Sequence, residues 1–161
     1  MEIIKITQVN DALTEMVALF RVELRSYKSI VSKTNIEAGR EDIEEYLAAG
    51  FPVFAAIMDG EYAGYVVCRV DSQVVWVESI FVKVEYRRHG VATALHSKAE
   101  EIAASYGEDT VYNYVHPNNH RMIEFLRKRG YTVLNLIEIR KPYKGEKLTQ
   151  TITVGEHAFD Y

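Results

Sequence analysis

The sequence predicts an α/β protein whose elements follow the order β-αα-βββ-α-β-α-ββ. Runs of alternating or β-branched apolar residues predict strands. Runs with apolar residues three and four positions apart predict helices. Glycines and prolines mark the points where one pattern gives way to the other. The 161 residues are 48% hydrophobic and 26% charged, which suits a single globular domain over residues 1–161.

The N-terminal third predicts one strand and two helices. Residues 2–8 alternate between apolar and polar side chains, which predicts a strand. Asn10 or Asp11 then caps a helix with a single apolar stripe. The stripe contains Leu13, Met16, Val17, Phe20, Leu24 and Tyr27. Residues 29–40 predict an irregular loop, and residues 41–49 predict a short acidic helix.

The rest of the chain predicts three antiparallel strands followed by mixed elements. Residues 51–58, 62–71 and 74–82 are rich in apolar and β-forming side chains, and Asp59-Gly60 favours a hairpin turn between the first two strands. The remaining predicted elements are a helix that begins after Gly90 and ends at Gly107, a strand over 110–115, and a helix from Asn118 or Asn119 to Gly130. Strands are then predicted over 132–139 and 148–154, and residues 157–161 form a short final strand or a tail.

A basic turn over residues 87–93 predicts a site for a phosphate-bearing ligand. It lies between a predicted strand and a predicted helix, where unpaired backbone N–H groups and the helix dipole favour an anion. Gly90 lets the backbone approach the anion closely, and Arg87 and Arg88 can add charge-assisted hydrogen bonds. No Lys-Ser/Thr pair follows the glycine, which excludes a Walker loop, and a Rossmann loop needs three glycines.

The turn also carries an Arg-x-x-Gly-x-Ala motif at residues 87–92, which matches the pattern Arg/Gln-x-x-Gly-x-Gly/Ala. Strand-like residues 78–87 lead into it, and residues 115–131 follow in the expected order. On these three segments the chain resembles the GNAT superfamily of acyl-CoA-dependent N-acetyltransferases, most closely over residues 74–131. The resemblance implies a GNAT fold, with a central mixed sheet flanked by helices, and acetyl-CoA (coenzyme A) as co-substrate.

The resemblance also assigns the contacts with coenzyme A. The pyrophosphate would meet backbone N–H groups of residues 88–93. The pantetheine arm would run along the strand before the turn, where a backbone N–H of Phe81 or Ile80 would stabilise the oxyanion. Asn119 would contact the arm, or would serve only as a helix N-cap. The implied cofactor-binding residues are Ile80, Phe81, Val82, Arg87, Arg88, His89, Gly90, Val91, Ala92, Thr93 and Asn119.

Glu78 is the candidate catalytic base. It is a carboxylate in an apolar strand, on the same face as Trp76 and Ile80, and burial beside Trp76 would raise its pKa. A salt-bridged strand residue is the alternative. The family's usual general acid, a Tyr, is replaced by Leu126, so the thiolate leaves unprotonated or another group serves. The candidates by position are Tyr114, His116 and Tyr143.

The predicted function is transfer of an acetyl group to a primary amine of a small molecule or peptide. The resemblance implies an acceptor pocket near loops 27–40 and 142–147. The acidic residues within 41–45 suit a cationic amine, or form a solvated helix face. Two alternatives are an acyl-CoA-binding sensor with little catalysis and a nucleotide- or RNA-binding domain that uses arginines such as Arg121 and Arg127. The net charge of −4 weakens the nucleotide- or RNA-binding alternative.

Composition sets the remaining expectations. Cys68, the only cysteine, lies in an apolar run and predicts a buried, inert thiol. The five histidines lack metal-ligand spacing, so no metal is expected, and His96 and His120 are predicted on helix surfaces. No leader or membrane-spanning run is apparent, which predicts a cytoplasmic protein without a membrane partner. The tail, residues 147–161, could complete the sheet or form a homodimer contact.

Overall fold

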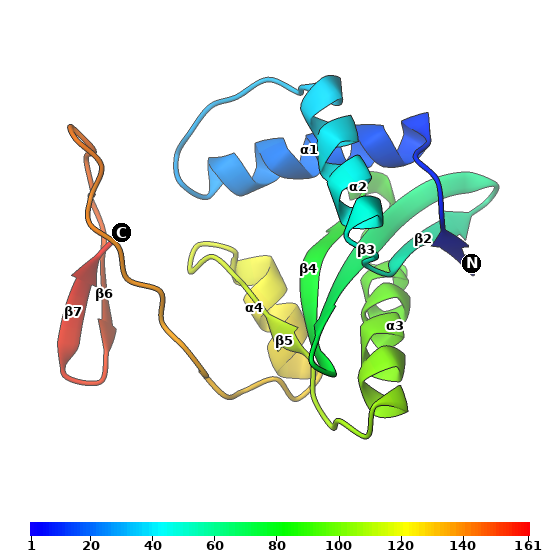
Figure 1. The fold of residues 1–161 in the computed structure, drawn as a ribbon. Coiled ribbons are helices and arrows are strands. Elements are labelled where there is room, and N and C mark those ends of the chain that lie inside the picture. Colours follow the sequence, from blue (N-terminus) through cyan, green and yellow to red (C-terminus); the bar gives the residue numbers. More distant parts are fainter. The chain divides into compact units, whose positions relative to one another are not determined.

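A computed structural model describes residues 1–161 and confirms the predicted order of elements. The chain divides into two compact units, Met1–Phe125 and Leu126–Tyr161. The first unit contains β1 (Glu2–Ile6), α1 (Asp11–Ser26), α2 (Ile36–Ala48), β2 (Val53–Met58), β3 (Glu61–Asp71), β4 (Val74–Val82), a 3₁₀ turn (Val84–Tyr86), α3 (Val91–Ser105) and β5 (Tyr112–Asn113) (Figure 1). Helix α4 (His120–Lys128) crosses the division, and the second unit contains β6 (Thr151–Val154) and β7 (His157–Asp160). None of these helices has the length and apolar character needed to span a bilayer.

The strands of the first unit form one mixed sheet in the order β1-β2-β3-β4-β5. The first four are antiparallel, and β5 runs parallel to β4. The turn between β2 and β3 has positive φ at Asp59 (53°) and Gly60 (83°), and the turn between β3 and β4 has positive φ at Ser72 (50°) and Gln73 (73°). Two successive positive φ angles give a turn whose twist matches that of the strands. The predicted meander is confirmed.

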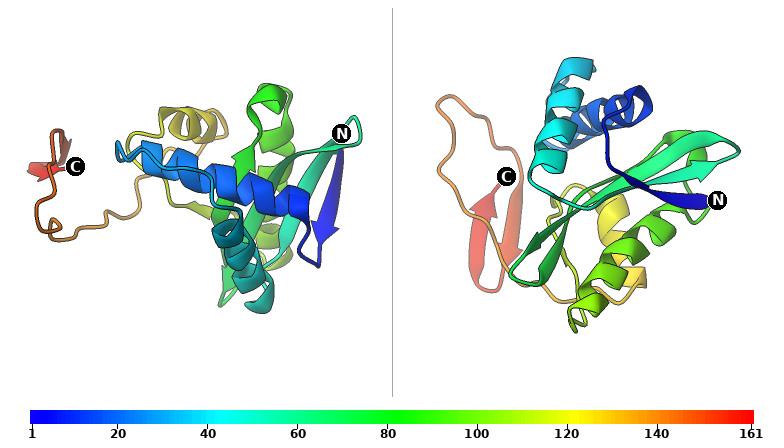
Figure 2. Two further views of the ribbon diagram at one scale, coloured as in Figure 1. Left: turned by 90° about the horizontal axis from the view of Figure 1, so that it is seen from above. Right: turned by 45° about the vertical axis from the view of Figure 1, so that its right-hand side comes forward.

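Helices cover both faces of this sheet (Figure 2). The core under α1 and α2 contains Ile6, Leu13, Met16, Val17, Ile43, Val53, Ala55, Tyr65, Val67 and Phe81. On the opposite face, α3 packs beside α4, where the rings of His96 and Phe125 lie 5.7 Å apart. Helices α1 and α2 cross very closely at Gly39, because a Cβ there would lie 2.6 Å from the carbonyl oxygen of Thr14. This crossing fixes α2 over the sheet.

Three predicted boundaries are wrong. Helix α2 begins at Ile36 because the side chain of Asn35 accepts the backbone N–H of Ala38 at 3.1 Å and caps the helix. Of the predicted strand 110–115, only β5 is regular. Residues 132–139 form no strand in this chain, although their composition favours one. Strand propensity alone is insufficient, because a strand needs a paired neighbour.

Candidate active site

The basic turn between β4 and α3 has a shape that exposes backbone N–H groups. Arg88 and Gly90 adopt left-handed φ angles of 69° and 81°, and Gly90 is the N-cap of α3. The first N–H groups of a helix lack partners within it, and turns with left-handed residues form anion-binding concavities. A Cβ added at Gly90 would meet no atom within 4 Å, so the turn faces open space. The turn therefore has the geometry expected of a phosphate site.

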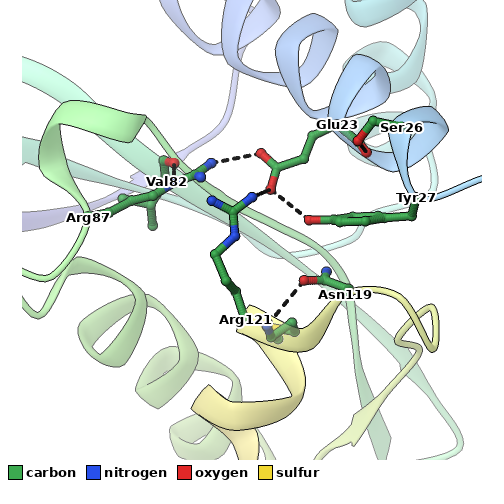
Figure 3. A network of polar contacts seen from close by, with 8 residues as sticks. Glu23, Ser26, Tyr27, Val82, Arg87, Asn119 and Arg121 are labelled. Carbon is green, nitrogen blue, oxygen red and sulfur yellow. Dashed lines mark hydrogen bonds and ion pairs between the residues drawn. The ribbon is translucent and has the colours of Figure 1, made fainter. Parts of the chain in front are cut away.

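Arg87, the first residue of the motif, is held against the protein. Its Nε donates to the carbonyl of Val82 at 2.9 Å, and its Nη2 donates to Glu23 at 2.7 Å (Figure 3). Its guanidinium also lies 5.7 Å from the ring centroid of Phe81. Arg87 thus joins the end of β4 to α1, and a carboxylate already balances its charge.

Glu23 on α1 accepts hydrogen bonds from three side chains. Besides Arg87, it accepts the hydroxyl of Tyr27 at 2.7 Å and Nη2 of Arg121 at 3.1 Å (Figure 3). Burial and the bond to Glu23 raise the pKa of Tyr27. The side chains of Glu23 and Arg87 are 23% and 22% exposed, whereas that of Arg121 is 68% exposed. One carboxylate therefore ties α1 to the basic turn and to the start of α4.

We expect Glu23→Gln to lower the free energy of unfolding by about 1–3 kcal/mol, because it leaves a mostly buried arginine without its charge partner. Arg121→Ala should cost less than about 1 kcal/mol, because exposed ion pairs contribute little. Chemical denaturation of both variants checks the ranking. Equal losses would show that the pair of Glu23 with Arg87 adds nothing to stability beyond the pair with Arg121.

Strands β4 and β5 separate half-way along β4. Their parallel pairing comprises only Trp76 with Tyr112 and Val77 with Asn113. Beyond this point, which we call the fork, residues 79–82 pair with β3 alone. A strand that lacks a neighbour on one side presents unpaired backbone N–H and C=O groups there.

The direction of these backbone groups follows from one hydrogen bond. The N–H of Lys83 donates to the carbonyl of Ala63, on the β3 side, at 3.0 Å. Backbone groups alternate between the two sides along an antiparallel strand. Ile80 and Val82 therefore direct their backbone groups to the open side, whereas Phe81 directs its own toward β3. Of the three strand residues expected to contact coenzyme A, Ile80 and Val82 have the suitable orientation.

Glu78 occupies a β-bulge at the fork. The register with β3 shifts between Val67 and Cys68, so Glu78 is an extra residue without a cross-strand partner. The bulge breaks the alternation of side chains, so Glu78 shares a face with Trp76 while Ile80 lies on the other face. The predicted common face of Glu78 and Ile80 is therefore wrong. The sequence gives no glycine or other signal for this bulge.

The carboxylate of Glu78 lies beside Arg69 of β3. Nε of Arg69 is 3.5 Å from Oε2, and the two side chains are 34% and 30% exposed. The guanidinium also lies 4.6 Å from the ring centroid of Trp76 and 5.9 Å from that of Tyr114. Nε of Arg69 makes no hydrogen bond, so its contact with Glu78 is electrostatic. The carboxylate keeps lone pairs for a water molecule or an amine.

Tyr46 of α2 lies within electrostatic reach of Glu78. Burial and, to a lesser extent, the charges of Asp42 and Glu78 raise the pKa of Tyr46 to about 12. Its hydroxyl therefore stays protonated and can donate a hydrogen bond. Tyr46 is not among the predicted site residues, because the sequence of α2 draws attention only to its acidic side chains. Glu23 is not among them either, because no local motif marks a contact between distant segments.

The residues before α4 connect it to α1. The side chain of Asn119 accepts the N–H of Met122 at 3.1 Å, which is N-cap geometry. Asn118 donates to the carbonyl of Tyr27 at 2.9 Å, and the ring of His116 stacks on Tyr27 at 6.2 Å. These contacts hold the start of α4 next to the end of α1.

His116 is poorly suited to act as a cationic acid. Its Nδ1 accepts the backbone N–H of Asn118 at 3.1 Å, which places the proton of the neutral ring on Nε2. Burial and then the charge of Lys28 lower its pKa from 6.5. The imidazole is therefore mainly neutral near pH 7. Tyr114 is 66% exposed, and Tyr143 belongs to the second unit, where its N–H donates to Glu146.

We expect Lys28→Gln to raise the pKa of His116, because it removes the nearby positive charge. An NMR pH titration of the ring nitrogens checks this. The lowered pKa means that the unfolded chain takes up this proton at a higher pH than the folded chain. The contribution of His116 to stability is therefore complete above about pH 6.5 and decreases below it. A pKa at or above the usual value in the wild type would contradict the expectation.

His96 corrects another prediction, because it is fully buried rather than on a helix surface. Nε2 lies 3.2 Å from the side-chain oxygen of Asn113, and Nδ1 lies 3.3 Å from Glu100. These contacts join α3 to β5, directly beside the fork. A polar side chain can be buried here because it has partners.

The thiol of Cys68 is buried, and burial raises its pKa to about 12. We therefore expect no reaction with Ellman's reagent in the folded protein and one equivalent after denaturation, since only the thiolate reacts. Rapid labelling of the native protein would contradict the buried placement. An unreactive thiol also leaves this reagent free to detect coenzyme A.

A cavity of about 350 Å³ lies between α1 and the end of β4, and Glu23, Phe81 and Arg87 are among its lining residues. Such a volume falls in the range of small-ligand sites. The chain contains no group of three or more His, Cys, Asp or Glu residues that could hold a metal ion.

A family model described as the acetyltransferase (GNAT) family matches residues 16–131. The chain belongs to this family. The GNAT fold is also found in solved structures that resemble the chain. AAC(6')-Iy, solved with the bisubstrate analogue CoA-S-monomethyl-acetylneamine, has a TM-score of 0.61 at 22% identity over 88% of this chain and 98% of its own.

Two further GNAT structures agree with this assignment of the fold. An acetyltransferase of the GNAT family from Staphylococcus aureus Mu50 has a TM-score of 0.60 at 18% identity, over 80% of this chain and 84% of its own. The aminoglycoside 6'-N-acetyltransferase AAC(6')-Ig from Acinetobacter haemolyticus has a TM-score of 0.57 at 18% identity, over 91% and 100%.

Proposed function

We propose that this GNAT protein transfers the acetyl group of acetyl-CoA to a primary amine of a small molecule or peptide by direct attack. One observation carries the proposal. The bulge at Glu78 coincides with the point where the pairing of β4 and β5 ends. From there an open strand edge leads toward the basic turn. A carboxylate and a turn suited to an anion therefore lie at the two ends of one strand segment with an open edge.

The basic turn is proposed to hold the pyrophosphate of acetyl-CoA. Backbone N–H groups of residues 88–93 would donate to it, with support from the dipole of α3. The open space around Gly90 supports this assignment. Arg87 would act mainly through Val82 and Glu23, by fixing the position of the turn.

The open edge of β4 is proposed to hold the pantetheine arm. Ile80 and Val82 direct backbone groups to that side. The carbonyl of Val82 already accepts from Arg87, so an amide-bearing chain can pair with both groups of Ile80 and with the N–H of Val82. The N–H of Ile80, the nearer to Glu78, would stabilise the negative charge on the carbonyl oxygen. The cap residue Asn119 would border the same arm.

Glu78 is proposed to accept the proton of the attacking amine, directly or through a water molecule. The amine nitrogen forms a bond to the thioester carbon, the carbon–sulfur bond breaks, and the electron pair leaves with the thiolate. A thiol has a modest pKa, so the thiolate can leave without a proton donor. This fits a chain with Leu126 where a Tyr is usual.

The acceptor is proposed to be a small-molecule amine, since the neighbouring structures include aminoglycoside acetyltransferases. Glu78 would favour a cationic acceptor, whereas Asp42 of α2 is already paired with Arg21 at 2.6 Å. A catalytically weak acyl-CoA-binding module is the second candidate, because Arg69 already pairs with Glu78. Residues 1–161 would act as a single domain in either case.

Turnover with pooled amines tests the proposal. Acetyl-CoA is incubated with the protein and panels of aminoglycosides, polyamines, amino acids and peptides, and the released thiol is measured with Ellman's reagent. We expect at least one panel to release coenzyme A faster than buffer does. Thermal stabilisation by acetyl-CoA without turnover on any panel would favour the binding module. Neither stabilisation nor turnover would contradict both.

A further inference from the structure

Arg69 of β3 lies beside the proposed base with its hydrogen-bonding capacity unused. Its Nε is buried and has no hydrogen-bond partner, and its other contacts are with Glu78 and with two aromatic rings. None of these contacts is a hydrogen bond. A guanidinium carries several N–H donors in one plane, and a buried donor without a partner costs free energy. A cation in this state is suited to an anionic ligand.

The side chain of Arg69 lies on the face of the sheet that α1 and α2 cover. Arg69 follows Tyr65 and Val67 at every second position of β3, and both belong to the core under these helices. Trp76 is its partner across the strands, so the two side chains share this face. The acceptor is expected on the same side, because the connection between α1 and α2 is expected to border it.

The ring of Trp76 fixes the orientation of the guanidinium. The guanidinium carbon of Arg69 lies 4.6 Å from the ring centroid of Trp76, and that ring packs against Tyr112 with 5.6 Å between the centroids. Stacking on an aromatic ring holds a guanidinium by its flat side. The N–H donors lie at its edge and stay available to a carboxylate, which a guanidinium binds through parallel hydrogen bonds. Arg69 is therefore oriented before a ligand arrives.

We propose that Arg69 binds a carboxylate of the acceptor, and that the acceptor carries this carboxylate and its amine on the same carbon atom, as a free amino acid does. This inference rests on the proposed acetyltransferase function. Nε of Arg69 lies 3.5 Å from Oε2 of Glu78, so the two charges are adjacent. A ligand with an adjacent ammonium and carboxylate matches both of them. The carboxylate pairs with Arg69, the ammonium pairs with Glu78 and gives it a proton, and the attack on the thioester follows as described above.

A polycationic acceptor suits this pair of side chains less well. Glu78 attracts one ammonium group, but Arg69 repels a second positive charge at short range. An acceptor without an anionic group also displaces water from Arg69 and leaves its donors unpaired, which penalises binding. Arg69 therefore selects amino acids over polyamines.

Matched acceptors test the proposal in the wild-type protein. Each standard L-amino acid is compared with its own amide, which lacks the carboxylate, and the release of coenzyme A gives kcat/KM for both. We expect the best amino acid to exceed its amide at least about 10-fold, which is typical of a hydrogen bond between charged groups. The amide has the lower amine pKa, because no negative charge lies beside its ammonium, so reactivity alone favours the amide. Equal or faster turnover of the amides overturns the proposal.

Arginine variants connect this preference to one side chain. Arg69→Met removes the charge and should reduce the preference to about twofold or less, mainly by raising KM for the amino acid. Arg69→Lys keeps the charge without the planar donors and should retain part of the preference. Arg40→Met is the matched control, because Arg40 is 36% exposed, close to the 34% of Arg69, and pairs with Asp11 at 2.9 Å. The control should keep the wild-type preference, and circular dichroism checks that each variant is folded.

The fluorescence of Trp76, the only tryptophan, reports binding without turnover. A carboxylate bound to Arg69 changes the charge beside this ring. In the presence of coenzyme A, the amino acid should therefore change the emission in a saturable way, whereas its amide should not. Arg69→Met should lose this response, and Arg40→Met should keep it.

The outcomes separate this inference from the proposed function. A saturable response that Arg69→Met loses, without turnover of any acceptor, supports the carboxylate site and contradicts the acetyltransferase. Turnover of amines without a preference for the carboxylate keeps the acetyltransferase and overturns the role of Arg69. A preference that Arg69→Met retains overturns that role as well, and so does the absence of both response and turnover with every amino acid.

Discussion

Gly90→Asp should raise the dissociation constant of acetyl-CoA at least about 100-fold, a loss of about 2.7 kcal/mol. The new carboxylate would stand where the backbone N–H groups are proposed to meet the pyrophosphate, and like charges at short range repel strongly. The left-handed φ of 81° adds a smaller penalty, because aspartate tolerates this conformation better than most residues. Isothermal titration calorimetry with acetyl-CoA and with free coenzyme A measures the effect.

Two matched variants separate charge from strain at Gly90. Gly90→Asn has nearly the same shape without the charge and should lose much less affinity. Gly107→Asp places the same side chain at the other end of α3, at a glycine with a φ of 82° and an equally open surrounding. It should leave the affinity within about twofold, because it lies far from the N-terminal dipole. Unchanged binding in Gly90→Asp would remove the basic turn from the cofactor site.

Glu78→Gln should reduce kcat by about 10²- to 10⁴-fold, which is the usual contribution of a general base. The dissociation constant of acetyl-CoA should change by less than about twofold, because the arm and pyrophosphate contacts remain. The residual rate should increase with pH, since free amine then forms without help from the enzyme. Steady-state kinetics over a pH series, combined with calorimetry, checks all three expectations.

The ion-pair alternative for Glu78 has a different signature. If Glu78 only balances Arg69, then Glu78→Gln and Arg69→Met should lower stability alike and leave kcat near the wild-type value. Glu61→Gln, at the start of β3, controls for the loss of a strand glutamate elsewhere in the sheet. Wild-type turnover in Glu78→Gln would contradict the assignment of Glu78 as the general base.

Local signals explain why much of the fold could be predicted from the sequence. Asp59-Gly60 suits a turn with two positive φ angles, and Asn10 caps α1 as expected, with its side chain 2.9 Å from the N–H of Leu13. Gly90 could be picked out because glycine is the residue that most readily adopts a left-handed conformation and because it has no Cβ. Each signal depends on a few adjacent residues.

The unpredicted features depend on residues that are far apart. The bulge at Glu78 arises from the register between β3 and β4, which no residue type marks. Glu23 meets Arg87 and Arg121 across 64 and 98 positions of the chain. The sequence around His96 is typical of a helix surface, because its contacts with Asn113 and Glu100 are not visible in it. Sequence periodicity reports local pattern, and these contacts need the folded chain.

The tight crossing at Gly39 has a consequence for how substrate preference could change. Helices α1 and α2 touch through backbone there, so even an alanine at this position would force them apart. The connection between them, residues 27–35, is thus anchored at both ends by helices in backbone contact. Tyr27 contacts Glu23 and Asn118, and Asn35 caps α2, so new lengths and side chains can be introduced between them, over residues 28–34, without touching the sheet. Libraries that vary residues 28–34 would test the expectation that this connection borders the acceptor pocket.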